Sequence, residues 1–358
     1  MVTSPQVSWL FFKAVRAGLA VRRPYLDSYR SIRRGGGKTA NSPRPIFNAS
    51  ISSLYARQCT SHQPLATSHS MKQVVITGVS TGIGHASVKF LLSRGFRVFG
   101  SVRSRGDADR LQREFGELFI PLLFDVTDEA AVQAEAEKVS QHLKTDTLDG
   151  LVNNAGIEVA GPLPHLSTDQ FRHQLEVNLL GPFIVTKTFL PLLGTDPARK
   201  GNPGRIVNIS SSSGKIAAPF TGAYAASKFG LEGFSESLRR ELILFGIDVI
   251  IIGPGAVVTP IWQKSDTGLI ERFRKTPFVE ALAKFERYAA KEGASGFPAE
   301  VIGRAVWHAL TTAKPKVRYA VVPNPLPNWI IPRLMPMRIL DKLVAEFMGI
   351  KPGSRGGR

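Results

Sequence analysis

Short apolar runs recur along the chain, with helical stretches between them. The runs lie at 74–77, 97–102, 120–124, 150–152, 205–209, 249–252 and 319–322. They are continuously apolar rather than alternating, which is typical of strands covered on both faces. Strands that alternate with helical stretches such as 130–143 predict a parallel, doubly wound α/β sheet of seven strands with right-handed crossovers.

The first run leads into a glycine-rich segment that suits a bound dinucleotide. Gly78 permits a tight turn, Gly82 lets the backbone approach a pyrophosphate, and Gly84 lets the next helix pack on the strand. The amides at the start of that helix would face the phosphates. The candidate cofactor-binding residues in this segment are Gly78, Ser80, Gly82, Ile83 and Gly84.

Tyr224 and Lys228 are four residues apart, which places them on one face of a helix. A cation beside a phenol favours the phenolate, so we expect Lys228 to lower the pKa of Tyr224 toward neutral pH. Ser211 ends a strand thirteen residues before Tyr224 and could hold a carbonyl or carbinol oxygen while Tyr224 transfers a proton. This offset favours Ser211 over its neighbours Ser210, Ser212 and Ser213.

These segments together resemble the short-chain dehydrogenase/reductase family, whose motifs are T-G-x-x-x-G-x-G, N-N-A-G and Y-x-x-x-K. The motifs occur here at 77–84, 153–156 and 224–228, and the resemblance spans about residues 71–260. It implies one Rossmann-type domain that transfers hydride reversibly between a nicotinamide and a carbonyl or alcohol carbon.

The resemblance also implies roles for four catalytic residues. Tyr224 would be the acid/base, and Lys228 would lower its pKa and bind the nicotinamide ribose. Ser211 would polarise the substrate oxygen, and Asn178 would fix a water in a proton relay. The alternative is a dinucleotide-binding regulator or scaffold that has lost its chemistry, although all four residues are present.

The cofactor is predicted to be NADP(H) rather than NAD(H). Val102 stands where an NAD enzyme usually has an acid, and Arg103 follows it, with Arg105 nearby, to bind a 2′-phosphate. Thr81 replaces the basic residue that many NADP-preferring relatives carry before the second glycine. Further implied cofactor contacts are Asp125, Val126, Asn153, Ala155, Tyr224, Lys228, Pro254, Val257 and Thr259.

Three of these cofactor contacts have other interpretations. Asp125 could be a solvated carboxylate at a strand end, and Asn153 could serve turn chemistry. Thr259 could equally cap a helix before Pro260. Asn154 is expected to be structural.

Residues 1–70 differ in composition from the rest of the chain. They carry ten Lys and Arg residues against the single acid Asp27, and they are rich in Ser and broken by Pro and Gly. This predicts a disordered leader, interpreted as a mitochondrial or, as an alternative, a plastid transit peptide. The other possibility is that translation starts at Met71 and the enzyme is cytoplasmic.

The remaining chain divides into a domain at 71–325, with a substrate lid at 257–300, and an apolar C-terminal extension at 326–358 that ends in a basic tail. The apolar side chains of the lid suit either a pocket or a core: Trp262, Leu269, Phe273, Phe278, Leu282 and Phe285. A steroid, retinoid or lipid-like substrate is therefore predicted by analogy alone. The extension could cover the substrate entrance, contact another subunit or, less favoured, touch a membrane surface.

The composition bears on the remaining partners. The formal net charge is +18, but much of it lies in the leader and the rest is scattered, which argues against nucleic-acid binding. Histidines lack the spacing of zinc ligands, so no metal site is predicted. By resemblance, the enzyme is expected to be a homo-oligomer that acts on a small-molecule carbonyl or alcohol.

Overall fold

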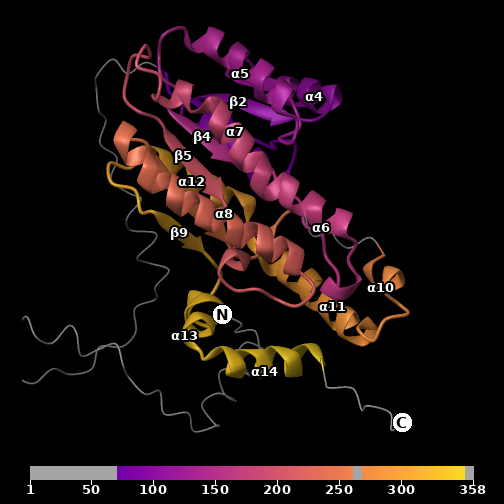
Figure 1. The fold of residues 1–358 in the computed structure, drawn as a ribbon. Helices are drawn as coiled ribbons and strands as arrows, with labels where there is room; N and C mark the ends of the chain where they lie inside the picture. Colours follow the sequence, from indigo (N-terminus) through magenta and orange to yellow (C-terminus); the bar gives the residue numbers. More distant parts are fainter. Residues whose placement is uncertain (1–70, 261–267, 351–358) are drawn as a thin grey trace, which may run out of the picture. The chain divides into compact units, whose positions relative to one another are not determined.

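The computed structural model describes residues 71–260 and 268–350. Within them, seven parallel strands form one sheet in the order β3-β2-β1-β4-β5-β6-β9 (Figure 1). The predicted seven-stranded, doubly wound Rossmann-type sheet is therefore confirmed. The leader, Trp262 of the lid and the basic tail lie outside the described residues.

The observed strands lie within one or two residues of the predicted apolar runs. Their bounds are β1 (Gln73–Ile76), β2 (Arg97–Val102), β3 (Phe119–Leu123), β4 (Gly150–Asn153), β5 (Arg205–Ile209), β6 (Asp248–Pro254) and β9 (Arg318–Val321). A separate pair of two-residue strands joins β7 (Val257–Val258) to β8 (Phe297–Pro298).

The helices connect these strands and carry the C-terminal extension. They are α3 (Gly82–Leu92), α4 (Arg105–Phe115), α5 (Glu129–Leu143), α6 (Thr168–Leu175), α7 (Gly181–Phe189), α8 (Gly222–Glu241), α10 (Leu269–Arg272), α11 (Val279–Ser295), α12 (Ala299–Thr311), α13 (Ile331–Leu334) and α14 (Met337–Met348). Two π-helical segments, η3 (Glu176–Leu180) and η7 (Leu326–Ile330), join α6 to α7 and precede α13.

Several helices begin where a polar side chain caps the first turn. The side chains of Ser104 and Asp128 accept hydrogen bonds from the amides of the third helical residues of α4 and α5. Ser167 and Gln170 form a reciprocal capping box at the start of α6. Each cap satisfies backbone amides that have no partner inside the helix, and so marks the residue at which the helix begins.

Helices cover both faces of the sheet, and each face has its own hydrophobic core. One core joins Val75 and Phe99 to side chains of α5, α7 and the end of α8. The other joins Val74 and Val98 to side chains of α3, α4 and α12. Neighbouring residues of one strand thus enter opposite cores, which is why the strands are apolar throughout.

A third core lies under the lid. Of the predicted lid residues, Leu269, Phe273, Leu282 and Phe285 are buried together with Ala160, Phe220 and Met348. Phe278 packs at the edge of this cluster. The sequence left open whether these residues line a pocket or form a core, and the structure shows that they form a core. Helix α14 packs on α11 through the ring pair Tyr288–Phe347. Among the described residues, no helix combines the length and apolarity needed to cross a bilayer.

Gly84 should be intolerant of any side chain. A Cβ there would overlap the Gly78 carbonyl oxygen and lie 2.6 Å from Asn154 Nδ2. We expect Gly84→Ala to lower the free energy of unfolding by about 1–3 kcal/mol through overpacking, as measured by urea denaturation followed by circular dichroism. A Cβ on Gly233 of α8 would meet nothing within 4 Å, so Gly233→Ala should raise stability by up to about 1 kcal/mol. Equal effects of the two substitutions would contradict this account.

Candidate active site

The glycine-rich loop between β1 and α3 has the backbone shape that a dinucleotide requires. Gly78 and Gly82 have φ values of +68° and +62°, which favour glycine. The Gly78 amide donates to Ser101 Oγ at 3.0 Å, and this bond ties the loop to β2. A Cβ on Gly78 would lie 2.8 Å from the Cα of Ala155. The loop is thus a close-packed cradle at the N-terminus of α3, where the first amides have no intrahelical partner.

The loop after β4 is held against this cradle. Thr77 Oγ1 accepts hydrogen bonds from the amides of Asn154 and Ala155 at 2.9 and 3.0 Å. The Asn154 side chain donates to the carbonyl oxygens of Thr77 and Gly78, both at 2.9 Å. Asn154 therefore has the structural role that was expected of it, and Ala155 lies beside the glycine loop.

The Asn153 side chain has its hydrogen-bond partners inside the protein. Its side chain is buried, and its amide nitrogen donates to Thr186 Oγ1 at 2.9 Å and to Asn208 Oδ1 at 2.8 Å. These partners lie on α7 and β5, inside the protein. The side chain thus joins a helix to the sheet, and the contact of Asn153 with a cofactor stays a prediction.

The carboxyl end of β2 has the charge pattern that the sequence suggested. Val102 is buried, whereas Arg103 is 73% exposed and its Nη1 lies 3.7 Å from Asp125 Oδ2. Burial pushes the pKa of Asp125 upward, but hydrogen bonds from Thr127 and the charge of Arg103 outweigh it, so the pKa is lowered and the carboxylate stays ionised. Val126 packs its side chain in the core, which leaves only its backbone for the predicted adenine contact.

The segment after β6 faces the glycine loop from the other side. A Cβ on Gly82 would lie 3.4 Å from the Thr259 side chain. The Thr259 hydroxyl donates weakly to the Val257 carbonyl oxygen at 3.5 Å. Pro254 and Val257 are buried within β6 and β7. Thr259 is therefore placed to touch a group held by the loop. Its alternative role as a helix cap depends on residues 261–267, which lie outside the described residues.

The predicted catalytic residues Ser211, Tyr224 and Lys228 come together where β5 meets α8. A side-chain hydrogen bond links Ser211 to Tyr224. Lys228 Nζ donates to the Ile209 carbonyl oxygen at 2.9 Å and lies 5.7 Å from the centre of the Tyr224 ring. Ser210 instead donates to Glu232 at 2.8 Å, so the structure favours Ser211 over Ser210 as the partner of the phenol.

The predicted effect of Lys228 on Tyr224 is not supported. Burial raises the pKa of Tyr224, the charge of Glu158 raises it further, and the hydrogen bond with Ser211 lowers it only in part. Burial lowers the pKa of Lys228 to about 8, against an opposing effect of Glu232. Desolvation outweighs the neighbouring cation, so the phenol is neutral near pH 7. A neutral phenol is the form that can donate a proton to a carbonyl oxygen.

Asn178 lies on the π-helical segment η3 and is completely buried. Its Oδ1 accepts from the Ile157 amide at 2.9 Å, and its Nδ2 donates to the Ile157 carbonyl oxygen and to Ser227 Oγ. A Cβ on Gly156 would lie 3.3 Å from Asn178 Oδ1 and 3.8 Å from Lys228 Nζ. Asn178 is thus close to the lysine, as the family resemblance implied, although its side chain also holds the loop after β4 and bonds to Ser227 on α8.

A buried ionic cluster behind Lys228 was missed by the sequence reasoning. Glu232 accepts from Arg318 Nε and Nη2 at 2.9–3.1 Å, and Lys215 Nζ lies 3.3 Å from it. Arg318 also donates to the Ser211 carbonyl oxygen at 3.3 Å. The four-residue step from Lys228 to Glu232 on one helix was a readable signal, but the partner on β9 was not.

Arg318 also connects this cluster to the C-terminal extension. Its guanidinium lies 4.5 Å from the centre of the Trp329 ring, and the guanidinium of Arg333 lies 4.6 Å from the same ring. Such cation–π contacts contribute about 0.5–2 kcal/mol each. The extension is therefore attached to the residue that holds the backbone of Ser211.

Glu158 is the second residue that the sequence reasoning missed. It lies two residues after the N-N-A-G motif, and burial raises the pKa of its carboxyl to about 7. Its charge acts on Tyr224. An acid just beyond this motif, in a loop at the carboxyl end of a parallel strand, was the available signal.

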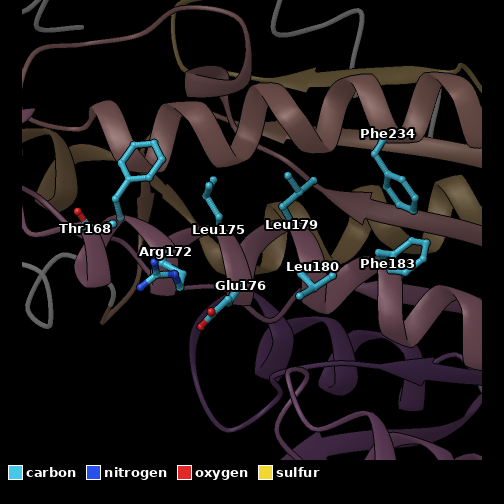
Figure 2. Close-up of a pocket in the computed structure, with 9 residues that line it drawn as sticks. Thr168, Arg172, Leu175, Glu176, Leu179, Leu180, Phe183 and Phe234 are labelled. Atoms are coloured by element: carbon cyan, nitrogen blue, oxygen red, sulfur yellow. The ribbon is translucent and has the colours of Figure 1, made fainter.

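An open apolar groove lies outside the catalytic cluster, between α8 and the continuous segment α6–η3–α7 (Figure 2). Its lining residues are Thr168, Phe171, Arg172, Leu175, Glu176, Leu179, Leu180, Phe183 and Phe234. Leu180 and Phe183 are 47% and 45% exposed. None of the four catalytic candidates lines the groove, so it is a surface feature distinct from the active site.

Comparison with known proteins agrees with this geometry. Residues 72–269 match the family model for short chain dehydrogenases. The chain is 36% identical to an NADPH-dependent 3-dehydrocapnine reductase of Ornithobacterium rhinotracheale, over 76% of this chain and 96% of that protein. It is also 36% identical to human retinol dehydrogenase 5, over 76% of this chain and 87% of that protein. A short-chain dehydrogenase from Streptomyces avermitilis superposes with a TM-score of 0.59 at 26% identity, over 79% and 96%.

The fold, the catalytic cluster and these similarities together place the protein in a known class. The chain belongs to the short-chain dehydrogenase family. It is an oxidoreductase that binds a nicotinamide dinucleotide and acts on alcohol or carbonyl groups of a small-molecule substrate.

Removing the Glu232 charge should affect both stability and pH dependence. Glu232→Gln leaves Arg318 and Lys215 without a carboxylate, which should cost about 3–5 kcal/mol. Because Glu232 raises the pKa of Lys228, that pKa should fall further below 8. Lys228 is cationic at low pH and loses its charge as pH rises through its pKa. With a lower pKa it would lose that charge at lower pH, so the alkaline decline of kcat should move to lower pH.

Urea denaturation and the pH profile of turnover measure the two effects of Glu232→Gln. The matched control is Glu236→Gln on the same helix, because the Glu236–Arg240 pair is exposed. It should change stability by less than about 0.5 kcal/mol and leave the profile in place. An unshifted alkaline limb in Glu232→Gln would refute the coupling to Lys228.

Proposed function

We propose that the protein is an NADP(H)-dependent oxidoreductase that reduces a carbonyl group of a hydrophobic substrate, in a reversible reaction. The observation that carries this proposal is the grouping of Ser211, Tyr224 and the buried Lys228 where β5 meets α8, with Lys228 Nζ 5.7 Å from the centre of the Tyr224 ring. Bound NADPH would supply the hydride. Tyr224 would donate the proton to the carbonyl oxygen, while Ser211 polarises that oxygen.

Lys228 and Asn178 would support this proton transfer. Lys228 is held at the Ile209 carbonyl oxygen, from where its ammonium would bind the nicotinamide ribose. Asn178 holds the loop after β4 beside the lysine and would help to position a water for the return of a proton to Tyr224. The glycine cradle with Ser80, Ile83 and Thr259 would hold the pyrophosphate and the nicotinamide end.

A Tyr224→Phe variant tests the proposed chemistry. The full-length protein and the variant would be compared for NADPH consumption with steroid, retinoid, long-chain and quinone carbonyls. We expect kcat to fall about 100- to 10,000-fold, because the proton donor is lost. NADPH affinity, measured by fluorescence titration, should change little. Tight NADPH binding without turnover by the parent protein on any substrate would favour a regulator or scaffold instead.

The preference for NADP(H) is supported by the valine at 102 and the exposed cation at 103. A relative described as NADPH-dependent is consistent with it. We expect Arg103→Ala to lower kcat/KM for NADPH about 10- to 100-fold and to affect NADH much less, because a charge-assisted contact to the 2′-phosphate is lost. The effect should shrink at high salt.

The control for Arg103 is Arg113→Ala, which removes an exposed arginine from the last turn of α4. It should leave the NADPH/NADH ratio of kcat/KM unchanged. A ratio that stays the same in Arg103→Ala would reject Arg103 as the basis of cofactor choice.

A hydrophobic substrate is supported by the position of the third core. Ala160 and Phe220, which belong to this core, lie on the loops after β4 and β5. These loops also carry parts of the catalytic site. The name of the human relative, a retinol dehydrogenase, is consistent with a lipid-like substrate.

A homodimer is proposed at the groove of Figure 2, with a second copy of the chain as its occupant. Arg172 and Glu176 lie one turn apart on its rim, so a two-fold axis could pair each with its opposite on the partner. We expect Phe183→Glu to convert the dimer to a monomer in light scattering, whereas Phe229→Glu, elsewhere on α8, should not. An unchanged mass for Phe183→Glu would place any subunit interface elsewhere.

The leader at residues 1–70 is proposed to direct the enzyme to the mitochondrion. Expressing the full chain and the chain from Met71, each with a C-terminal fluorescent tag, would test this assignment. Identical distributions of the two proteins would reject it.

A further inference from the structure

The turn at residues 210–215, which carries Ser211, is attached at both ends to one buried carboxylate. Ser210 Oγ donates to Glu232 Oε1 at 2.8 Å, and Lys215 Nζ lies 3.3 Å from Glu232 Oε2. Within the turn, the Ser213 amide donates to Ser211 Oγ at 3.0 Å. The direction of the Ser211 hydroxyl therefore depends on the backbone of this turn.

Arg318 on β9 joins the backbone of Ser211 to the same carboxylate. Its Nε donates to the two Glu232 oxygens at 3.1 and 3.0 Å, and its Nη2 donates to Glu232 Oε1 at 2.9 Å. Nη2 also donates to the Ser211 carbonyl oxygen at 3.3 Å. The bond to Ser211 is the longest of these, so it is the first to be lost when the guanidinium moves. The position of the Arg318 guanidinium thus determines whether the Ser211 backbone is held.

Strand β6 leaves room for this guanidinium at Gly253. A Cβ on Gly253 would lie 2.3 Å from Arg318 Nη2 and 2.8 Å from Arg318 Cζ. A larger residue at this position would push the guanidinium away from its partners. The sheet is therefore shaped around one position of the Arg318 head group.

Trp329 of the C-terminal extension holds the guanidinium from a second side. Arg318 Cζ lies over the indole ring, 4.5 Å from its centre, and Trp329 is only 9% exposed. Hydrogen bonds restrain the guanidinium from the side of Glu232 and Ser211, and the ring restrains it from the side of the extension. The two kinds of contact together fix the head group.

The extension that carries Trp329 is itself anchored. Asn328 Nδ2 donates to the Pro323 carbonyl oxygen at 2.9 Å, and the guanidinium of Arg333 lies over the Trp329 ring at 4.6 Å. At the far end of α14, Met348 is buried in the third core, beneath the lid. Trp329 therefore has a fixed position.

We propose that Trp329 is a positioning residue for the reaction, which acts through Arg318 to hold Ser211 where it polarises the substrate oxygen. This inference rests on the proposed function, in which Ser211 has that role. It makes the C-terminal extension part of the catalytic machinery, because turnover depends on the contact between the indole and the guanidinium. Trp329 contributes no proton and no hydride.

The test replaces Trp329 by side chains with and without a ring, in the full-length protein. NADPH consumption would be followed with the steroid, retinoid, long-chain and quinone carbonyls. Trp329→Leu should lower kcat about 10- to 100-fold, because a misplacement of about 1 Å can cost about 100-fold in rate. The KM of the carbonyl compound and the Kd of NADPH should change little. Trp329→Phe keeps a ring beside the guanidinium and should recover most of kcat.

Trp307→Leu is the matched control for lost stability. The guanidinium of Arg94 lies over the Trp307 ring, 4.9 Å from its centre, and Arg94 follows the end of α3 that is remote from the glycine loop. The control removes a similar cation–π contact and should lower stability in urea without lowering kcat. A fall in kcat that occurs in Trp329→Leu alone thus separates positioning from folding.

Two further variants test the route through Arg318 to Ser211. Gly253→Ala leaves the indole in place but displaces the guanidinium, so it should lower kcat by a similar factor and leave NADPH binding intact. In a Ser211→Ala background, Trp329→Leu should have little further effect on kcat, because the group that it positions is already gone.

Several results would overturn the inference: an undiminished kcat in folded Trp329→Leu, an equal fall in Trp307→Leu, or full additivity of Trp329→Leu with Ser211→Ala. The proposed function fails separately. Loss of reduction in Tyr224→Phe together with normal turnover in Trp329→Leu would overturn the role of Trp329 alone. Absence of Tyr224-dependent reduction of every carbonyl compound would overturn both.

Discussion

The parallel direction of the strands is the constraint on which the active site depends. In a parallel sheet all carboxyl ends lie at one edge, so the loops after β1, β4, β5 and β6 meet there. The order of strands reverses between β1 and β4, and Thr77 and Asn154 join the two loops at that point. The glycine loop, Ser211 and the segment after β6 are thus brought to one place, although they are far apart in the sequence.

Burial determines the electrostatics of this place. Lys228, Glu232 and Arg318 are largely removed from water, and each is stabilised by specific partners. Tyr224 and Glu158 are both shifted toward their neutral forms by desolvation. Desolvation therefore favours the protonated phenol, which can act as a proton donor.

Much of the fold and the catalytic set could be predicted because their signals are local. Apolar runs located all seven strands, and the helical spacing of Tyr224 and Lys228 placed them together on α8. Features whose partner comes from another element were not foreseen. Asn153 Nδ2 bonds to α7 and β5, burial and Glu158 raise the pKa of Tyr224, and Glu232 is paired with Arg318 on β9.

The sequence by itself determined the order of strands and helices, the glycine loop, and the residue types available for acid/base chemistry, since these depend on neighbours within a few residues. The tertiary structure decided which of those residues are desolvated and what they face. Burial and pairing across the sheet are set by contacts between distant segments, such as Arg318 with Ser211 and Arg318 with Glu232. For that reason the charge state of the site is a property of the fold and not of any motif.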